Sequence, residues 1–217
     1  MRYEPPPDEG LAIHYRDEHL LIVDKPAGLL SVPGRGEDKQ DCLWKRVQRH
    51  FPQALVVRRL DMATSGLVLF ALDREAQGRM GQLFGERRVH KRYVAVVAGC
   101  VIQDDGKIDL PLTTDWPNRP RQKVDARLGR PAFTHWRVLA RDAEHRFTRV
   151  ELLPLTGRSH QLRVHMLALG HPILGDELYG DAPVRQAAAR LLLHAQALAF
   201  EHPASGERVE VESPVPF

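Results

Sequence analysis

The sequence has no run of about 18 apolar residues, the length that a membrane-spanning helix requires. Neither the basic start nor the apolar core of a secretory signal peptide occurs in its first ten residues, MRYEPPPDEG. These two absences predict a soluble protein of the cytoplasm that has no membrane partner.

Cysteine is scarce, because only Cys42 and Cys100 occur and neither belongs to a CxxC pair. This scarcity argues against a disulfide framework and against a cysteine-based zinc site. The chain has 11 histidines, but no carboxylate or cysteine partners recur beside them at the spacing of metal ligands. We therefore expect two reduced, buried thiols and no metal ion.

The chain has 217 residues, of which 43% are hydrophobic, so it can bury one substantial core, and we expect one compact domain. The formal net charge is only +3, but the basic residues are clustered. Any one cluster is explained by a solvated face, whereas four together favour the binding of a polyanion. The clusters lie at residues 45–50, 58–59, 87–92 and 119–130, and much of the acid lies at 201–212.

Short hydrophobic runs bounded by Gly, Pro and Asp predict many strands, and a few segments have the helical period. The chain is therefore predicted to be of mixed α/β class. The strands are expected at residues 20–24, 66–72, 93–98, 133–140, 147–153, 191–200 and 207–212. Helices are expected at 41–51, after Asp73 as N-cap, and over 162–169, where Gly170 ends the helix.

Turns and loops are predicted between these elements, at residues 28–36, 104–106, 142–145 and 205–206. In the helix at 41–51, Leu43, Val47 and Phe51 share one face, and Lys45, Arg46 and Arg49 are expected to lie elsewhere. Residues 1–19, which include three consecutive prolines, are predicted to form a poorly ordered arm.

The segment at residues 58–66, RRLDMATSG, contains one acidic residue, Asp61, in a basic and polar stretch that leads into an apolar strand. A carboxylate at that point stands at the mouth of a core. One alternative is structural, since an Asp before Thr64 and Ser65 can organise a turn through side-chain hydrogen bonds.

This segment resembles HRLDxxTSG, the hallmark of the RluA family of pseudouridine synthases, at every fixed position except the first, where Arg58 replaces His. Other family segments are matched in order at residues 24–34 (DKPAGLLSVPG), 90–95 (HKRYVA), 157–165 (GRSHQLRVH), 170–180 (GHPILGDELYG) and 192–195 (LLHA). The resemblance runs from about residue 20 almost to the C-terminus. Residues 115–124, DWPNRPRQKV, are similar to the short branch of the family, which lacks an N-terminal RNA-binding domain.

The resemblance implies a catalytic domain over residues 20–217, without a separate N-terminal RNA-binding domain. It implies a mixed α+β fold, with a curved and largely antiparallel sheet, flanking helices and a central active-site cleft. The activity it implies is the isomerisation of uridine to pseudouridine in structured RNA, at a tRNA anticodon stem-loop and a 23S rRNA stem-loop. No cofactor or metal is implied, and we expect a monomer.

By the same resemblance, Asp61 is the catalytic carboxylate, and Arg163 is the cation that keeps this carboxylate ionised. Tyr93 matches the family tyrosine, whose ring stacks on the target base. Arg59 fills the place of the flipped uridine or contacts its phosphate. The alternatives without a functional role are a surface helical arginine at 163, a core tyrosine at 93 and a surface cation at 59. Further RNA contacts are expected from Arg58, Lys91, Arg119, Arg121 and Lys123.

Two other classes of function are weighed against this one. A non-catalytic RNA-binding protein would not need Asp61, Tyr93 and Arg163 together. A carboxylate-dependent glycoside hydrolase normally needs two positioned carboxyl groups, and no second acidic residue has support comparable to that for Asp61.

Overall fold

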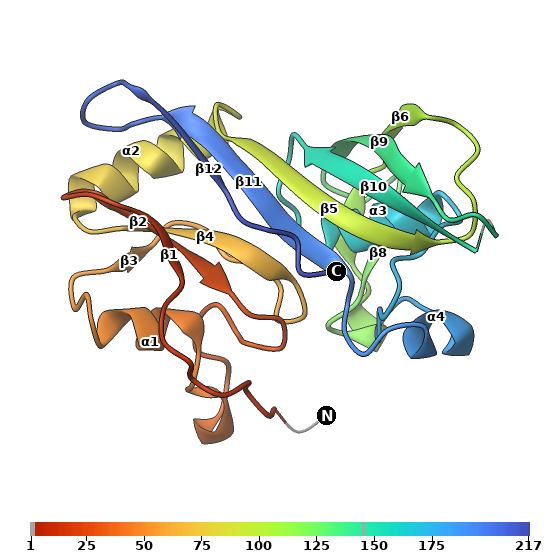
Figure 1. Cartoon of the computed structure of the whole chain (residues 1–217), viewed down its shortest axis with the longest axis horizontal. Helices are drawn as coiled ribbons and strands as arrows, with labels where there is room; N and C mark the ends of the chain where they lie inside the picture. Colours follow the sequence, from red (N-terminus) through yellow and green to blue (C-terminus); the bar gives the residue numbers. More distant parts are fainter. Residues whose placement is uncertain (1–2, 145) are drawn as a thin grey trace. The chain divides into compact units, whose positions relative to one another are not determined.

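In the computed structural model, which describes residues 3–144 and 146–217, the chain forms two compact units. The first consists of Met1–His90 and Ala195–Pro216, and the second of Lys91–His194 with Phe217. In each unit, antiparallel strands and a few short helices share the core (Figure 1), which confirms the predicted mixed class. Across the described ranges, no helix is both long enough and apolar enough to cross a membrane.

The sheet of the first unit is built around β4 (Ser65–Ala71), which is buried at every residue. It pairs antiparallel with β2 (Leu20–Lys25) and with the two-residue β3 (Leu55–Val56). Strand β2 pairs in turn with β1 (Ile13–Arg16). Strand β11 (Leu193–Glu201) lies next to β4 and carries β12 (Arg208–Glu212) on its other side. A strand that is apolar throughout requires cover on both faces of its sheet.

Two helices provide this cover, one on each face of β2 and β4 (Figure 1). Ile22 and Leu69 pack with Met80 of α2 (Arg74–Gly85). Their neighbours in sequence point to the opposite face, where Val23 and Phe70 share a cluster with α1 (Leu43–Gln48). Both predicted helices are therefore confirmed, although α1 is shorter than the predicted 41–51.

Gly66 lets β4 approach β11 closely. Its φ is +110°, and a Cβ atom at this position would lie 2.3 Å from the carbonyl oxygen of Ala195. Only glycine satisfies both the dihedral angle and the contact.

The N-terminal segment differs from the prediction of a poorly ordered arm. Residues 13–16 form β1, and the carbonyls of Pro6 and Pro7 accept hydrogen bonds from Arg46 at 2.7 and 3.1 Å. Arg46, which was predicted to lie away from the apolar face of the helix, is buried and also binds Asp41 through two hydrogen bonds of 2.9 and 2.7 Å. The guanidinium thus provides donors for two carbonyls of the proline segment, which lies outside the strands.

The second unit carries four antiparallel strands in the order β5 (His90–Ala98), β10 (Phe147–Pro154), β9 (Phe133–Arg141) and β6 (Asp105–Asp109). The predicted hairpin of β9 and β10 is confirmed, while His145 of its turn lies outside the described residues. The turn predicted at 104–106 is wrong in part, because Gly106 lies in β6. Its missing side chain leaves room for Trp136, whose ring would lie 2.7 Å from a Cβ atom there.

Helix α3 (Gln161–Ala168) ends as predicted at Gly170, whose φ is +88°. The amide of His171 donates to the Met166 carbonyl at 2.9 Å, which satisfies a carbonyl of the last turn. The unit also contains α4 (Ala182–Gln186) and a separate hairpin of β7 (Leu112–Thr114) and β8 (Gln122–Val124). Two short 3-10 turns, η1 (Glu37–Lys39) and η2 (Trp116–Asn118), lie in loops.

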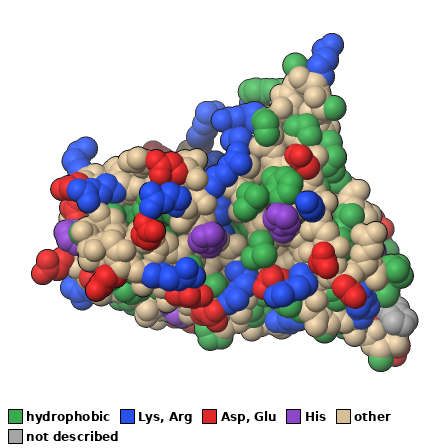
Figure 2. All heavy atoms as spheres, turned by 90° about the horizontal axis from the view of Figure 1, so that it is seen from above, with side chains coloured by type: hydrophobic (Ala, Val, Ile, Leu, Met, Phe, Trp, Pro, Cys, Tyr) green, Lys and Arg blue, Asp and Glu red, His purple; other side chains and the backbone are tan. Residues whose placement is uncertain are grey.

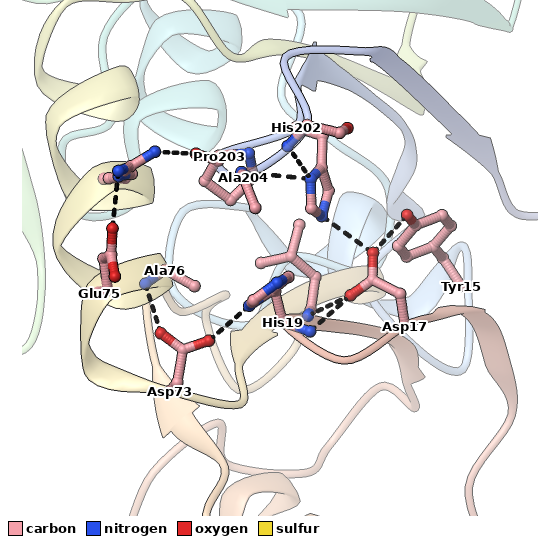
Figure 3. Close-up of polar contacts among 12 residues, drawn as sticks. Tyr15, Asp17, His19, Asp73, Glu75, Ala76, His202, Pro203 and Ala204 are labelled. Atoms are coloured by element: carbon pink, nitrogen blue, oxygen red, sulfur yellow. Dashed lines mark hydrogen bonds and ion pairs between the residues drawn. The ribbon is translucent and has the colours of Figure 1, made fainter.

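A cluster of ionisable side chains joins three segments of the first unit (Figure 3). Asp17 lies in the turn between β1 and β2 and accepts a 2.6 Å hydrogen bond from the Tyr15 hydroxyl. Its carboxylate lies 2.9 Å from Nε2 of His202, in the turn after β11. Burial, and then the hydrogen bond to Asp17, raise the pKa of Tyr15 to about 12, so this hydroxyl remains a donor at neutral pH.

The same cluster holds the N-terminus of α2 (Figure 3). Asp73 accepts a hydrogen bond from the Ala76 amide at 2.7 Å, as an N-cap does. Its other oxygen lies 2.8 Å from Nδ1 of His19. The hydrogen bond to Asp73 raises the pKa of His19, and the Ala76 amide, then His19, lower the pKa of Asp73.

Asp73→Asn keeps an oxygen for the Ala76 amide but removes the charge beside His19. Because the pKa of His19 is raised in the folded state, its pairing stabilises the fold below the unfolded value of about 6.5 and is lost as pH rises through the raised value. The lowered pKa of Asp73 keeps the pair charged down to about pH 4. We expect urea unfolding to show a larger loss of stability at about pH 5.5 than at about pH 9.

Asp73→Ala is the matched control, since it also removes the cap. It should show the pH-dependent loss of Asp73→Asn and, in addition, lose about 1 kcal/mol more at every pH, the usual cost of removing an N-cap. If Asp73→Asn were destabilised equally at both pH values, the charged pair with His19 would not contribute.

Candidate active site

Asp61 lies in the first unit, in the loop between β3 and β4, and its side chain is half-buried. The turn after it is closed by the main chain, because the Thr64 amide donates to the Asp61 carbonyl oxygen at 3.2 Å. A main-chain hydrogen bond therefore closes this turn.

Lys25 fixes the residue that follows Asp61. Its side chain is 1% exposed, and its ammonium group donates to the carbonyl oxygens of Met62 at 2.9 Å, Leu29 at 2.7 Å and Pro26 at 2.9 Å. An ammonium has three donors, and a buried one is tolerated only when they are used. The Met62 carbonyl also accepts the Gly28 amide at 2.9 Å.

Ser31 fixes the residue that precedes Asp61. Its hydroxyl donates to the Leu60 carbonyl at 2.8 Å and accepts from the Leu60 amide at 3.1 Å. Both neighbours of Asp61 are thus held by the loop after β2. The sequence comparison marked residues 24–34 as a motif but assigned no role to Lys25 or Ser31. The sequence feature that could have pointed to Lys25 is its position as a lysine at the end of an apolar strand.

Arg58 and Arg59, the two cations before Asp61, are both exposed. The guanidinium carbon of Arg58 lies 5.1 Å from the centre of the Phe84 ring on α2, within the range of a cation–π contact. The residue that replaces the family histidine therefore packs on helix α2. The exposure of Arg59 leaves its predicted role in RNA binding open to test.

Arg163 lies on α3 of the second unit and is 4% exposed, so the alternative of a surface helical arginine is wrong. It forms a two-point ion pair with the buried Asp176, through Nε at 2.8 Å and Nη2 at 2.6 Å. Asp176 also accepts the amides of Leu178 and Tyr179 at 3.0 and 3.1 Å. The pair fixes the plane of the guanidinium.

Tyr179 connects Arg163 with the hairpin of β7 and β8. Its ring centre lies 5.0 Å from the guanidinium carbon of Arg163. Its hydroxyl accepts the Gln122 amide of β8 at 2.8 Å and lies 2.7 Å from Nδ1 of His160. The sequence comparison quoted residues 170–180 as a motif and missed the roles of Asp176 and Tyr179, because neither follows from spacing.

Tyr93 is half-buried on β5, opposite Leu152 of β10, at the point where the strand passes from exposed to buried residues. Lys91, one of the predicted RNA contacts, is half-buried and donates to the Thr156 carbonyl at 3.3 Å. Lys91 therefore contributes to the local structure of the second unit, whatever it binds.

The buried histidine His165 is structural. Its Nδ1 lies 2.9 Å from the Thr134 hydroxyl, its Nε2 lies 3.0 Å from the Leu110 carbonyl, and burial lowers its pKa. Among residues 3–144 and 146–217, no group of three or more His, Cys, Asp or Glu is arranged to hold a metal ion. Cys42 is buried, which raises the pKa of its thiol, but Cys100 is only half-buried, contrary to prediction.

The remaining predicted RNA contacts, Arg119, Arg121 and Lys123, lie in the hairpin of β7 and β8 and are exposed. Elsewhere the charges are mixed: acidic and basic side chains are interspersed over most of the face in Figure 2. Net charge therefore does not identify an RNA-binding face by itself.

Comparison with known proteins identifies the family. Residues 19–168, which include Asp61, Tyr93 and Arg163, match the RNA pseudouridylate synthase family. The dual-specificity RNA pseudouridine synthase RluA of Escherichia coli (strain K12) is 51% identical over 215 residues, which cover 99% of this chain and 98% of the relative. The enzyme of the same name from Yersinia pestis is 52% identical over 196 residues, 90% of this chain and 95% of the relative.

Solved structures agree with the sequence relatives. Human RNA Pseudouridylate Synthase Domain Containing 1 is 35% identical, with a TM-score of 0.81 over 99% of this chain and 87% of that chain. Human RNA Pseudouridylate Synthase Domain Containing 4 has the same fold, with a TM-score of 0.74 over 95% of this chain and 88% of that chain. The chain therefore belongs to the RNA pseudouridylate synthase family and, within it, is similar to the RluA enzymes.

Proposed function

We propose that this protein isomerises uridine to pseudouridine in tRNA and 23S rRNA stem-loops, with Asp61 as the catalytic carboxylate. In this reaction the N1–C1′ bond breaks, the uracil rotates and a C5–C1′ bond forms. C5 loses a proton and N1 gains one, so no oxidant, reductant or cofactor is consumed. The family supports the reaction on RNA. The two named RNA substrates are what the resemblance of residues 115–124 implies, and the relatives are named dual-specificity RNA pseudouridine synthases, which is consistent with two substrates.

The proposal rests on one observation: the residues on both sides of Asp61 are held by hydrogen bonds to their main chain. Leu60 is held by Ser31, and Met62 is held by Lys25 and Gly28. A nucleophile must keep its position while the substrate moves, and such bonds to the adjacent main chain restrict the loop. A carboxylate that only organised a turn would not require a buried ammonium group bonded to the next residue, as Lys25 is to Met62.

Tyr93 and Arg163 complete the proposed catalytic group. By the family match, Arg163 is proposed as the cation that favours the ionised Asp61 carboxylate, and its ion pair with Asp176 fixes the plane of the guanidinium. Tyr93 offers its ring to the flipped uracil and its hydroxyl to proton transfer at C5. We propose residues 20–217 as the catalytic domain and a cytoplasmic monomer as the working form.

Contacts with RNA are proposed for the cations around these residues, Arg58, Arg59, Lys91, Arg119, Arg121 and Lys123. Exposed cations bind phosphates and position the RNA without reading its sequence. Arg59 is proposed to occupy the space of the extruded uridine, because base extrusion costs a few kcal/mol that a long side chain can offset.

Asp61→Asn should abolish product formation and leave RNA binding within about threefold of the parent, since the change removes a charge but little volume. We expect the rate to fall by more than about a thousandfold, the scale on which removal of a nucleophile acts. Nucleoside analysis of a uridine-labelled tRNA anticodon stem-loop measures the product, and a filter assay measures binding.

Asp38→Asn is the matched control, because Asp38 lies in the same unit and its side chain is 62% exposed. It should retain parental activity. Pseudouridine formation by Asp61→Asn at the parental rate would overturn the catalytic assignment. Release of free uracil by the parent would indicate a hydrolase, and unchanged RNA would indicate a protein that only binds.

Tyr93→Phe separates stacking from proton transfer. It keeps the ring that holds the base but loses the hydroxyl, so kcat should fall by about 100-fold or more while KM stays within about threefold. Tyr93→Leu should raise KM as well. Multiple-turnover initial rates at varied RNA concentration provide both constants, and a Phe variant with parental kcat would exclude a role for the hydroxyl.

A further inference from the structure

One segment of the second unit has features that the catalytic group does not use. Residues 112–130, here called the basic arm, comprise β7, the η2 turn, β8 and the turn that follows. The arm is closed at its base by two hydrogen bonds between Leu112 and Arg130, at 3.0 and 2.8 Å. Trp116, on the η2 turn, is 66% exposed, which is rare for so large an apolar side chain.

The basic arm concentrates positive charge. Its five basic and two acidic side chains give a net charge of +3, equal to that of the whole chain. The acidic side chains are used within the arm, since Asp115 accepts from Asn118 at 2.9 Å and Asp125 accepts the amides of Arg127 and Leu128 at 3.0 and 2.9 Å. Within the described part of the chain, no ion pair with a carboxylate involves the basic side chains, Arg119, Arg121, Lys123, Arg127 and Arg130.

The tryptophan and the cations are adjacent. The guanidinium carbon of Arg119 lies 4.6 Å from the centre of the Trp116 ring. This contact holds the ring in place while most of its surface stays in solvent. A fixed aromatic face beside cations is the arrangement by which proteins hold unpaired bases together with their phosphates.

The basic arm is also tied to Arg163. Thr114 pairs with Gln122 in the hairpin, and the Gln122 amide donates to Tyr179, whose ring packs on Arg163. Trp116 is only two residues from Thr114, so its backbone lies within about 13 Å of Gln122, given about 3.5 Å per residue and 5.5 Å across a pair. RNA bound near Arg163 therefore passes within reach of the tryptophan.

We propose that Trp116 is a stacking platform for an unpaired base of the substrate RNA loop, with Arg119, Arg121 and Lys123 holding the phosphates beside it. This inference rests on the proposed function for the identity of the RNA. The base occupies the ring face that Arg119 leaves open. The excess of cations favours a nucleic acid over an apolar protein surface as the occupant.

Trp116→Leu and Trp116→Phe test the role of the aromatic face, because leucine keeps apolar bulk without a π face. The probe is a labelled RNA stem-loop with the sequence of a tRNA anticodon arm, and its Kd is measured by fluorescence anisotropy with the full chain. We expect Trp116→Leu to raise Kd about tenfold and Trp116→Phe about threefold or less, within the range seen for stacking residues. Leu128→Ala, at an equally exposed position of the same arm, is the control and should bind like the parent.

An abasic scan of the RNA loop identifies the partner base. RNA that lacks the stacked base should bind the parent about tenfold more weakly and should bind Trp116→Leu no more weakly than intact RNA does, since the same contact is already lost. Equal Kd values for the parent and Trp116→Leu on intact RNA would overturn the proposal. So would a change in sedimentation of Trp116→Leu without RNA, which would indicate a protein contact.

These outcomes are separable from those of the catalytic test. If the parent formed no pseudouridine but Trp116→Leu still weakened binding at one loop base, the proposed reaction would fall and the platform would stand. If pseudouridine formed normally and no loop base depended on Trp116, the platform would fall and the reaction would stand.

Discussion

The loop that carries Asp61 depends on one buried ammonium group. Lys25 is almost wholly removed from water, and such a charge is costly unless its donors are all used. Three carbonyl oxygens meet this requirement, and one of them belongs to Met62, directly after Asp61. The position of the loop is therefore coupled to the solvation of a charge, which makes small displacements expensive. Ser31 adds a second attachment on the other side of Asp61.

The second unit also buries a cation, but there the charge is paired with a carboxylate and not with carbonyl oxygens alone. Arg163 is buried on α3, and its charge is balanced by Asp176, whose carboxylate is completed by two backbone amides. A buried pair gains specificity more than stability, because desolvation offsets much of the attraction. In both units, then, a buried cation is bound by oxygen acceptors of the same unit. Of the proposed catalytic residues, Arg163 is such a cation, and Asp61 lies next to an acceptor in sequence.

The sequence predicted those features that depend on residues close together in the chain, and it missed those that depend on distant residues. Periodicity located the strands of both cores and the N-cap at Asp73, because those features are local. Periodicity missed β6, because Asp105 and Gly106 are typical turn residues, whereas Trp136 packs against Gly106 in the strand. It also missed the burial of Arg46, whose carbonyl partners Pro6 and Pro7 are about 40 residues away in the sequence. The resemblance to family motifs named Asp61 and Arg163. The roles of Lys25, Asp176 and Tyr179 depend on contacts with Met62, Arg163 and Gln122, which the spacing of residues in the sequence does not reveal.

The requirement for glycine at position 66 limits which codon changes the fold can accept. Every change at the first or second base of a glycine codon that still encodes an amino acid introduces a side chain with a Cβ atom. At this position that atom would meet the Ala195 carbonyl at 2.3 Å, on a backbone that L-residues rarely adopt. Drift at the codon is thus confined to silent third-base changes. Five residues after Asp61, the fold thus requires a hydrogen atom where any other amino acid would place a carbon.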